Sequence, residues 1–210
     1  MSDARRRRLR LEISREASRL FWEHGVDATS GEQIAEAVGL SVRTVWRHFR
    51  SKEACAEPIV AQGMRWEMAM LASWPAHLSL EDHLAAETHG FGRQTDPVAL
   101  LDNELAMKMI RLADTEPALR TAWLMACDQM EREMAHVIAA RLGKAAGDLD
   151  VRLHAATSSA ALRVISEDIG TALLAGVDPA DFSDAPIRVA EALRRATGGA
   201  IGDPIAPATP

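Results

Sequence analysis

Histidines and cysteines are the side chains of this sequence best suited to binding a metal ion or acting in catalysis. His77, His83 and His89 follow one another at intervals of six residues, whereas two metal ligands on one helical face need a spacing of four. Cys55 and Cys127 show no CxxC spacing, and no His–acid pair is arranged beside either of them. Glycine-rich phosphate loops are absent from the sequence. We therefore predict no metal site, no cofactor and no enzymatic activity.

The basic residues are concentrated at the beginning of the chain. The net charge of all 210 residues is −6. Residues 1–55 hold 11 Lys and Arg against 8 Asp and Glu, which is +3, and the remainder hold 13 against 22, which is −9. A basic end on an acidic body is typical of a DNA-binding region joined to a region that avoids DNA. A solvated basic N-terminus is the alternative on charge alone.

Two short helices joined by a tight turn, a helix-turn-helix, are predicted over residues 30–49. Ser30 begins a capping box at the first helix, and Ser41 is a good N-cap for the second. Ala35 is small enough for the helices to cross closely, and Gly39 permits the turn. The apolar residues of the crossing are Ile34, Val38, Leu40, Val45 and Phe49. A generic helical hairpin is the alternative to a DNA-binding motif.

The second helix of this motif keeps one face free of the crossing. The residues predicted to point outwards are Val42, Arg43, Thr44, Trp46 and Arg47. Such a helix can enter the major groove of DNA, with its N-terminal residues nearest the base edges.

Helical spacing continues through the rest of the chain, and no stretch alternates with a period of two. Start and stop signals place further helices at about residues 5–24, 51–74, 79–90, 96–113, 115–142, 148–175 and 185–196. Pro58 falls past the first turn of the helix expected from Ser51, where proline predicts a kink. We predict an all-α protein with a disordered tail from Ile201, where prolines accumulate without periodicity.

The stretch TSGEQIAEAVGLSVRTVWRHFRSKEA, residues 29–54, resembles the TetR family of transcriptional regulators. The positions that match the family pattern in register are Ile34, Ala35, Gly39, Ser41, Thr44, His48, Phe49, Lys52 and Glu53. The resemblance implies an N-terminal three-helix DNA-binding domain, residues 5–55, and a helical effector-binding and dimerisation domain, residues 56–200. The disordered tail would span residues 201–210.

The resemblance also implies roles for single residues. Arg43 and Thr44 lie where the family contacts bases and phosphates, and Trp46 and His48 occupy positions that reach phosphates. Lys52 stands where the family grips a phosphate. Arg43 replaces a frequent glycine and adds a guanidinium group suited to guanine. The predicted DNA-binding residues are Ser41, Val42, Arg43, Thr44, Trp46, Arg47, His48 and Lys52.

Methionine and tryptophan are concentrated between residues 64 and 134, and methionine suits an adaptable apolar cavity. An ordinary helical core is the alternative. The stretches ADTEPALRTAW and AARLG look like the C-terminal domain of regulators that sense long acyl chains or acyl-CoA. The predicted effector pocket, with Arg111 as a cation for an anionic head group, is lined by Phe91, Met107, Arg111, Trp123 and Met130.

The resemblance implies a homodimer formed through the two C-terminal helices. The residues predicted to pack there are Ala155, Ala156, Ser159, Leu162, Ile169, Ala190 and Leu193. No apolar run approaches the ~18 residues of a membrane span, so we expect a cytoplasmic protein. We expect a repressor that an apolar or acyl-type effector releases from a palindromic DNA operator. The alternatives are an activator of the same fold, or a helical small-molecule-binding protein or enzyme without DNA binding.

Overall fold

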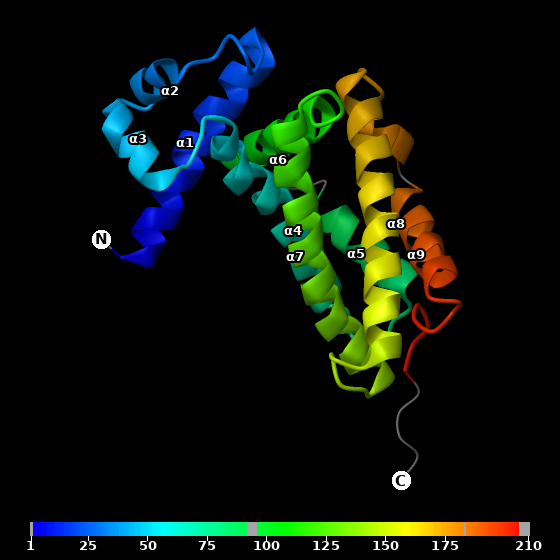
Figure 1. Cartoon of the computed structure of the whole chain (residues 1–210). Helices are drawn as coiled ribbons and strands as arrows, with labels where there is room; N and C mark the ends of the chain where they lie inside the picture. Colours follow the sequence, from blue (N-terminus) through cyan, green and yellow to red (C-terminus); the bar gives the residue numbers. More distant parts are fainter. Residues whose placement is uncertain (1, 92–95, 183, 206–210) are drawn as a thin grey trace. The chain divides into compact units, whose positions relative to one another are not determined.

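The computed structural model describes residues 2–91, 96–182 and 184–205 (Figure 1). Its elements are α1 (Asp3–His24), α2 (Gly31–Ala37), α3 (Val42–His48), η1 (Glu53–Ala56), α4 (Glu57–Ala72), α5 (Leu80–Phe91), α6 (Pro97–Leu112), α7 (Pro117–Leu142), α8 (Leu149–Leu174), η2 (Pro179–Phe182) and α9 (Ala185–Ala196). The two η elements are short 3₁₀ helices. No strand occurs in these ranges, so the predicted all-α fold is confirmed. No helix among the described residues is both long and apolar enough to span a membrane.

The chain divides into two compact units. The first unit is Met1–Gly63 with Asp96–Ala126, and the second is Met64–Thr95 with Cys127–Pro210. Helices α4 and α7 each begin in the first unit and end in the second. The helix-turn-helix therefore shares a unit with α6 and the beginning of α7. The domain boundary near residue 55 that the sequence suggests stays a prediction.

The core of the first unit lies between α1 and the helix-turn-helix. Helix α1 contributes Ile13, Ala17 and Phe21, and α2 and α3 contribute Ile34 and Val45; all five are completely buried. Full burial of an aliphatic or aromatic side chain is worth about 1.5–3 kcal/mol. This packing holds α2 and α3 in place, since seven-residue helices are too short to be stable alone.

A bidentate ion pair joins α1 to α6 inside the first unit. Arg15 Nε and Nη2 donate to the two carboxylate oxygens of Asp102 at 2.6 and 2.9 Å. The Asp102 side chain is only 7% exposed and that of Arg15 24%. Charge-assisted pairs of this geometry are strong and directional, so the pair fixes α6 against α1.

The proline of the fourth helix does not produce the predicted kink. Residues Glu53–Ala56 form the separate 3₁₀ helix η1, so α4 begins at Glu57 and Pro58 lies in its first turn. Proline is tolerated there, because the missing N–H has no partner within the helix. Ser14 of α1 supplies a cap from outside, since its Oγ accepts from Ile59 N at 3.0 Å.

In the second unit α9 packs against both α8 and α5, and Figure 1 shows α8 and α9 side by side. Most of the predicted interface residues are covered within the single chain. Ala155, Ser159, Leu162, Ala190 and Leu193 are at most 5% exposed, and Ser159 Oγ donates to the Cys127 carbonyl of α7 at 3.2 Å. The prediction that these five residues face a second copy is therefore wrong. Ala156 and Ile169 are half-buried, and for these two it stays a prediction.

A different face of α8 and α9 is apolar and exposed. Leu149, Leu153 and Val164 of α8 are 65%, 55% and 54% exposed, and Ile187 of α9 is 51% exposed. With the exposed Thr157 and Ala160, the α8 residues recur at helical spacing on one stripe.

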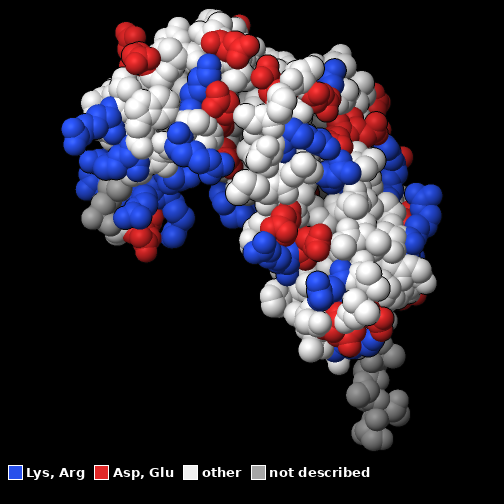
Figure 2. Space-filling view, viewed as in Figure 1, with Lys and Arg blue, Asp and Glu red and all other residues white. Residues whose placement is uncertain are grey.

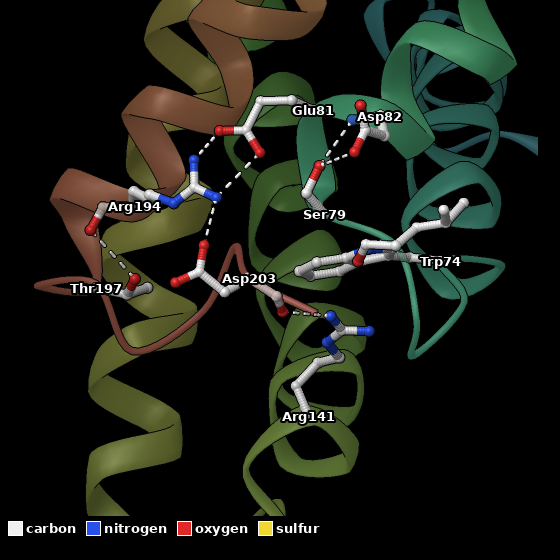
Figure 3. Close-up of polar contacts among 9 residues, drawn as sticks. Trp74, Ser79, Glu81, Asp82, Arg141, Arg194, Thr197 and Asp203 are labelled. Atoms are coloured by element: carbon white, nitrogen blue, oxygen red, sulfur yellow. Dashed lines mark hydrogen bonds and ion pairs between the residues drawn. The ribbon is translucent and has the colours of Figure 1, made fainter. Parts of the chain in front are cut away.

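The segment after α9 folds back onto the second unit (Figure 3). Leu80 N donates to Gly202 O and Ile205 N to Ala76 O, both at 2.8 Å. Arg194 pairs with Glu81 and with Asp203. Residues 201–205 are thus ordered, contrary to the prediction, because backbone and arginine partners replace the missing periodic apolar residues. Residues 206–210 lie outside the described residues.

The guanidinium of Arg141 completes this attachment. It lies 3.5 Å from the ring centroid of Trp74 and donates to Pro75 O at 3.1 Å and to Asp203 O at 2.8 Å. Figure 3 shows Arg141 below Trp74, with its guanidinium directed toward the Asp203 carbonyl. Burial lowers the pKa of Arg141, but an arginine stays charged at neutral pH.

Candidate DNA-binding site

Local hydrogen bonds set the bounds of the helix-turn-helix. Gln33 N donates to Ser30 Oγ at 3.2 Å and Ser30 N donates to Gln33 Oε1 at 2.7 Å, which is the predicted capping box. Gly39 adopts a φ of +65° at the turn, a conformation that favours glycine. Ser41 Oγ accepts from Thr44 N at 3.2 Å, so α3 begins as predicted.

The indole of Trp46 packs over the first residue of α2. A Cβ added to Gly31 would overlap Cζ2 and Cη2 of Trp46. Trp46 remains 41% exposed, so one part of its ring packs on α2 and the rest faces solvent. Sequence reasoning missed Gly31, whose only sequence signal was a glycine directly after the N-cap serine.

The remaining predicted residues of α3 differ in how free they are. Arg43 and Arg47 are exposed, and neither has a hydrogen bond or ion pair within the described part of the chain. Val42 and Thr44 are half-buried. The Thr44 hydroxyl lies 2.8 Å from Ser41 Oγ, so both hydroxyls are engaged with each other. The two arginines are therefore the groups of α3 most available to an outside partner.

A basic hollow lies where the end of α3 meets the N-terminal turns of α1. It encloses about 420 Å³ and is lined by Arg6, Arg10, Arg47 and His48. None of its lining residues is acidic. Figure 2 shows basic side chains gathered over this part of α1 and α3. Three guanidinium groups around one hollow suit an anion such as a phosphate.

His48 is an uncharged hydrogen-bonding group in this hollow. Burial lowers its pKa, and the charges of Arg47, Arg10 and Arg6 lower it further. Its Nε2 is buried and has no hydrogen-bond partner among the described residues. Arg10 fixes the end of α3 from the other side, donating to His48 O and stacking 4.4 Å from the ring centroid of Phe49.

Lys52 is turned into the domain. Its Nζ donates to the backbone carbonyls of Val26, Asp27 and Thr29 at 2.7, 3.3 and 3.0 Å. An ammonium group has three donors, so all of them are used to hold the loop between α1 and α2.

Arg6 and Arg10 are the site residues that sequence reasoning did not single out. Both belong to the basic cluster at the start of the chain, and they stand four positions apart. That spacing places two side chains on one face of a helix. The signal was therefore present, but locating the hollow also requires knowing how α1 packs against α3.

The predicted effector residues do not form one described site. Met107, Arg111 and Trp123 belong to the first unit and Met130 to the second. Trp123 and Met130 are buried, Met107 is half-buried, and Arg111 is exposed and pairs with Asp114. The side chain of Phe91 lies outside the described part of the structure. This pocket stays a prediction.

Comparison with known proteins decides the family. A family model described as "Bacterial regulatory proteins, tetR family" matches residues 13–59, and one described as "MftR C-terminal domain" matches residues 84–177. The HTH-type transcriptional regulator TcmR of Streptomyces glaucescens is 38% identical over 172 residues, which span 77% of this chain and 73% of TcmR. The chain belongs to the TetR family of transcriptional regulators.

Two solved structures share the fold. GusR of Salmonella enterica has a TM-score of 0.57 at 18% identity, covering 90% of this chain and 94% of GusR. FadR of Thermus thermophilus, a TetR-family repressor solved with lauroyl-CoA, has a TM-score of 0.53 at 19% identity, covering 96% of this chain and 98% of FadR. At this identity the likeness concerns the fold alone.

The described residues also contain no group of three or more His, Cys, Asp and Glu side chains able to hold a metal ion. Cys55 and Cys127 are buried, and neither forms a disulfide within the described residues. Burial raises the pKa of the Cys55 thiol to about 12, so the thiol is protonated at neutral pH and a poor nucleophile.

Proposed function

We propose that this TetR-family regulator is a cytoplasmic repressor that binds a palindromic operator through α3 and leaves it when a small apolar effector binds. The observation that carries the proposal is that Arg43 and Arg47 of α3 are exposed without a polar partner among the described residues, next to the basic hollow. Free guanidinium groups on an exposed recognition helix match the polyanionic surface of the major groove.

The predicted DNA-binding residues divide into contact and positioning roles. Arg43, in the first turn of α3, reads a base edge. Arg47, His48, Arg6 and Arg10 receive a backbone phosphate in the hollow, where the buried Nε2 of neutral His48 gains the partner it lacks.

The other predicted residues shape the recognition helix. Ser41 and Thr44 begin it, and Val42 presents a half-buried apolar side chain suited to a thymine methyl group. Trp46 sets the distance between α2 and α3 through its packing on Gly31. Lys52 positions the loop before α2.

A palindromic operator requires a dimer with two-fold symmetry. The exposed stripe of Leu149, Leu153 and Val164 on α8, together with Ile187 on α9, is the surface that supports this assembly. In the DNA-bound dimer the two α3 helices would lie about 34–36 Å apart, one turn of DNA. A variant with Leu153→Glu and Val164→Glu should be monomeric by light scattering. Assayed at the same protein concentration as the wild type, this variant should lose cooperative binding to the operator.

The effector binds more tightly to a conformation in which the two α3 helices have a different separation. The loss of DNA-binding free energy cannot exceed the difference in the effector's binding free energy between the two conformations. An acyl chain or acyl-CoA is the narrower expectation from the sequence. A thermal-shift series of fatty acids and acyl-CoAs of graded length tests it, and an unchanged melting temperature across the series would exclude acyl ligands. A reporter assay in a deletion strain distinguishes a repressor from an activator of the same fold. Expression of the target gene rises when a repressor is deleted.

The DNA contacts are tested on duplexes from the upstream region of the gene, by fluorescence anisotropy at several salt concentrations. Arg43→Ala should cost about 1–3 kcal/mol and relax preference at one base position. Arg47→Ala should weaken binding to all sequences and reduce the salt slope by about 0.9. Arg132→Ala, on α7 in an exposed pair with Asp128, is the control. If both α3 variants keep the affinity and the salt slope of the wild type, α3 does not contact DNA through Arg43 and Arg47.

A further inference from the structure

A carboxyl group that has no ion-pair partner in the described ranges is buried in the second unit. Glu67 of α4 is half-buried as a residue, but its Oε2 is buried and has no hydrogen-bond partner among the described residues. Its Oε1 accepts from Ser166 Oγ of α8 at 3.3 Å. Burial raises the pKa of Glu67 to about 7, partly offset by the Ser166 hydrogen bond. Near neutral pH a large share of this group is the uncharged acid, which donates as well as accepts.

A second polar group on α8 is buried without a partner. Ser158 is completely buried, and its Oγ has no hydrogen bond within the described residues. Ser158 precedes Ser166 by eight residues, which corresponds to about 12 Å along the helix axis. Buried polar groups are normally satisfied, so two such groups facing the interior of one unit require an explanation.

The unit that contains Glu67 also buries several methionines. Met64 and Met68 flank Glu67 on α4, and both are buried. Met130 and Met134 of α7 are buried in the same unit. Flexible thioether side chains can repack around ligands of different shape. Binding sites for small molecules combine such walls with a few polar groups that fix orientation.

The charges near this cluster argue against an anionic ligand. The charged residues of α8 on either side of Ser166 are Arg163 and Glu167, and they pair with each other at 2.9 Å. Among the described residues no cation acts on the pKa of Glu67, whose shift comes from burial and from Ser166. An anionic head group brought here would face the Glu67 carboxyl group with no cation of the described part of the chain to compensate it. A cation would have to lose its hydration shell, which costs far more than desolvating a neutral hydroxyl or carbonyl.

We propose that Glu67, Ser166 and Ser158 form the polar side of the effector site, and that the effector is an uncharged, mainly apolar molecule carrying hydroxyl or carbonyl oxygens. The proposal rests on the function proposed above and names the ligand class. It replaces the anionic head group of the acyl-CoA expectation with a neutral oxygen that exchanges hydrogen bonds with the Glu67 carboxyl.

The experiment compares ligands that share one apolar body and differ in the polar end. The probes are 2-naphthol, 2-naphthoate and 2-naphthylmethylamine, with the three-ring equivalents, titrated into the full-length protein at pH 7 and followed by calorimetry and thermal shift. The variants are Glu67→Gln, Glu67→Leu and Ser166→Ala. The control is Glu191→Gln, which changes an exposed carboxylate of α9.

The neutral hydroxyl compounds should bind the wild type at least tenfold more tightly than the carboxylates. Glu67→Leu should lose at least tenfold in affinity, whereas Glu67→Gln, whose amide still donates and accepts, should keep most of it. Glu67→Gln should also reduce the difference in affinity between the hydroxyl compounds and the carboxylates. Equal binding of carboxylates, tighter binding of the amine, or unchanged affinity in a folded Glu67→Leu variant would overturn the proposal.

The outcome is separable from that of the proposed function. DNA release by a compound whose binding does not depend on Glu67 would support the proposed regulatory function and contradict the proposed ligand site. Binding that depends on Glu67 but leaves operator affinity unchanged would support the site and contradict its role in release.

Discussion

The recognition helices of the first unit and the long helices of the second unit handle polar groups in opposite ways. Helices α2 and α3, seven residues each, are held by caps, by Gly31 and by packing on α1. They leave Arg43 and Arg47 at the surface, with no ion pair to any residue that the structure describes. The 26-residue helix α8 instead turns Ser158 inwards, toward a unit that also buries the Glu67 carboxyl.

The difference follows from the partners the two regions are suited to. A polyanion is bound by charges that remain in solvent until counterions are released. A small molecule is selected by a few buried groups whose hydrogen bonds are costly to leave unmade. Replacing the exposed charged residues of α3 should therefore leave the free energy of unfolding unchanged. Replacing polar residues buried inside either unit should change it.

The largest effect is expected where α1 joins α6. Arg15→Ala leaves the Asp102 carboxylate, 7% exposed, without its partner, and breaking a mostly buried pair costs about 3 kcal/mol. Denaturant unfolding measures the loss. The matched control is Arg19→Ala on the same helix, whose pairs with Glu16 and Glu23 are exposed and worth about 0.5 kcal/mol. Similar losses for both variants would show that the Arg15 pair has no special role.

Glu67→Gln should remove a pH dependence of stability. The folded-state pKa of Glu67 is raised to about 7, so the folded protein binds more protons than the unfolded chain between roughly pH 4.5 and 7. Stability therefore falls as pH rises through this window, by about 3 kcal/mol in total. The difference in unfolding free energy between variant and wild type should grow from pH 5 to pH 8. A constant difference would contradict the buried carboxyl.

Gly31→Ala tests the packing of α2 on α3. The added methyl overlaps the Trp46 indole, and overpacking costs about 1–3 kcal/mol. We expect a lower melting temperature and weaker operator binding, both largely restored in the double variant with Trp46→Ala. Gly147→Ala, where an added Cβ meets nothing within 4 Å, is the control. If Gly31→Ala alone melts at the wild-type temperature, the Trp46 indole moves aside without cost.

The smallest effect is expected at the C-terminal segment. Gly202 has a φ of +127°, and an added Cβ would lie 2.7 Å from Arg194 Nε. Gly202→Ala should displace the Arg194 side chain from Glu81 and Asp203 and cost about 1 kcal/mol. Hydrogen exchange at Leu80 N, which donates to Gly202 O, should rise. Unchanged protection there would mean that the segment adapts without loosening.

Local signals made the helix-turn-helix predictable. The N-cap serines, the capping-box glutamine and Gly39 lie within a few residues of the groups they bond, so the sequence alone places them. Leu119, Trp123 and Met130 of α7 are buried, which agrees with the ordinary helical core that the sequence left open as the alternative to a pocket.

Groups whose partners are distant in the sequence were not predictable in the same way. Lys52 reaches carbonyls 23–26 residues away, and Asp102 meets Arg15 across 87 residues. Helical spacing shows that α8 has two faces, but it does not show which one receives α9. The small residues were therefore assigned to a second copy, and the larger, exposed Leu149 and Leu153 were overlooked.

The central claim is that α3 and the basic hollow read DNA as a symmetric pair. Selection of duplexes from a random-sequence library by the purified full-length protein tests it most directly, with Arg43→Ala selected in parallel. We expect the wild type to enrich a palindrome whose half-site centres lie about 10 base pairs, or a multiple of that, apart. The Arg43→Ala selection should return the same palindrome with one position in each half-site relaxed. Enrichment of no sequence by the wild type, or identical enrichment by both proteins, would contradict the account.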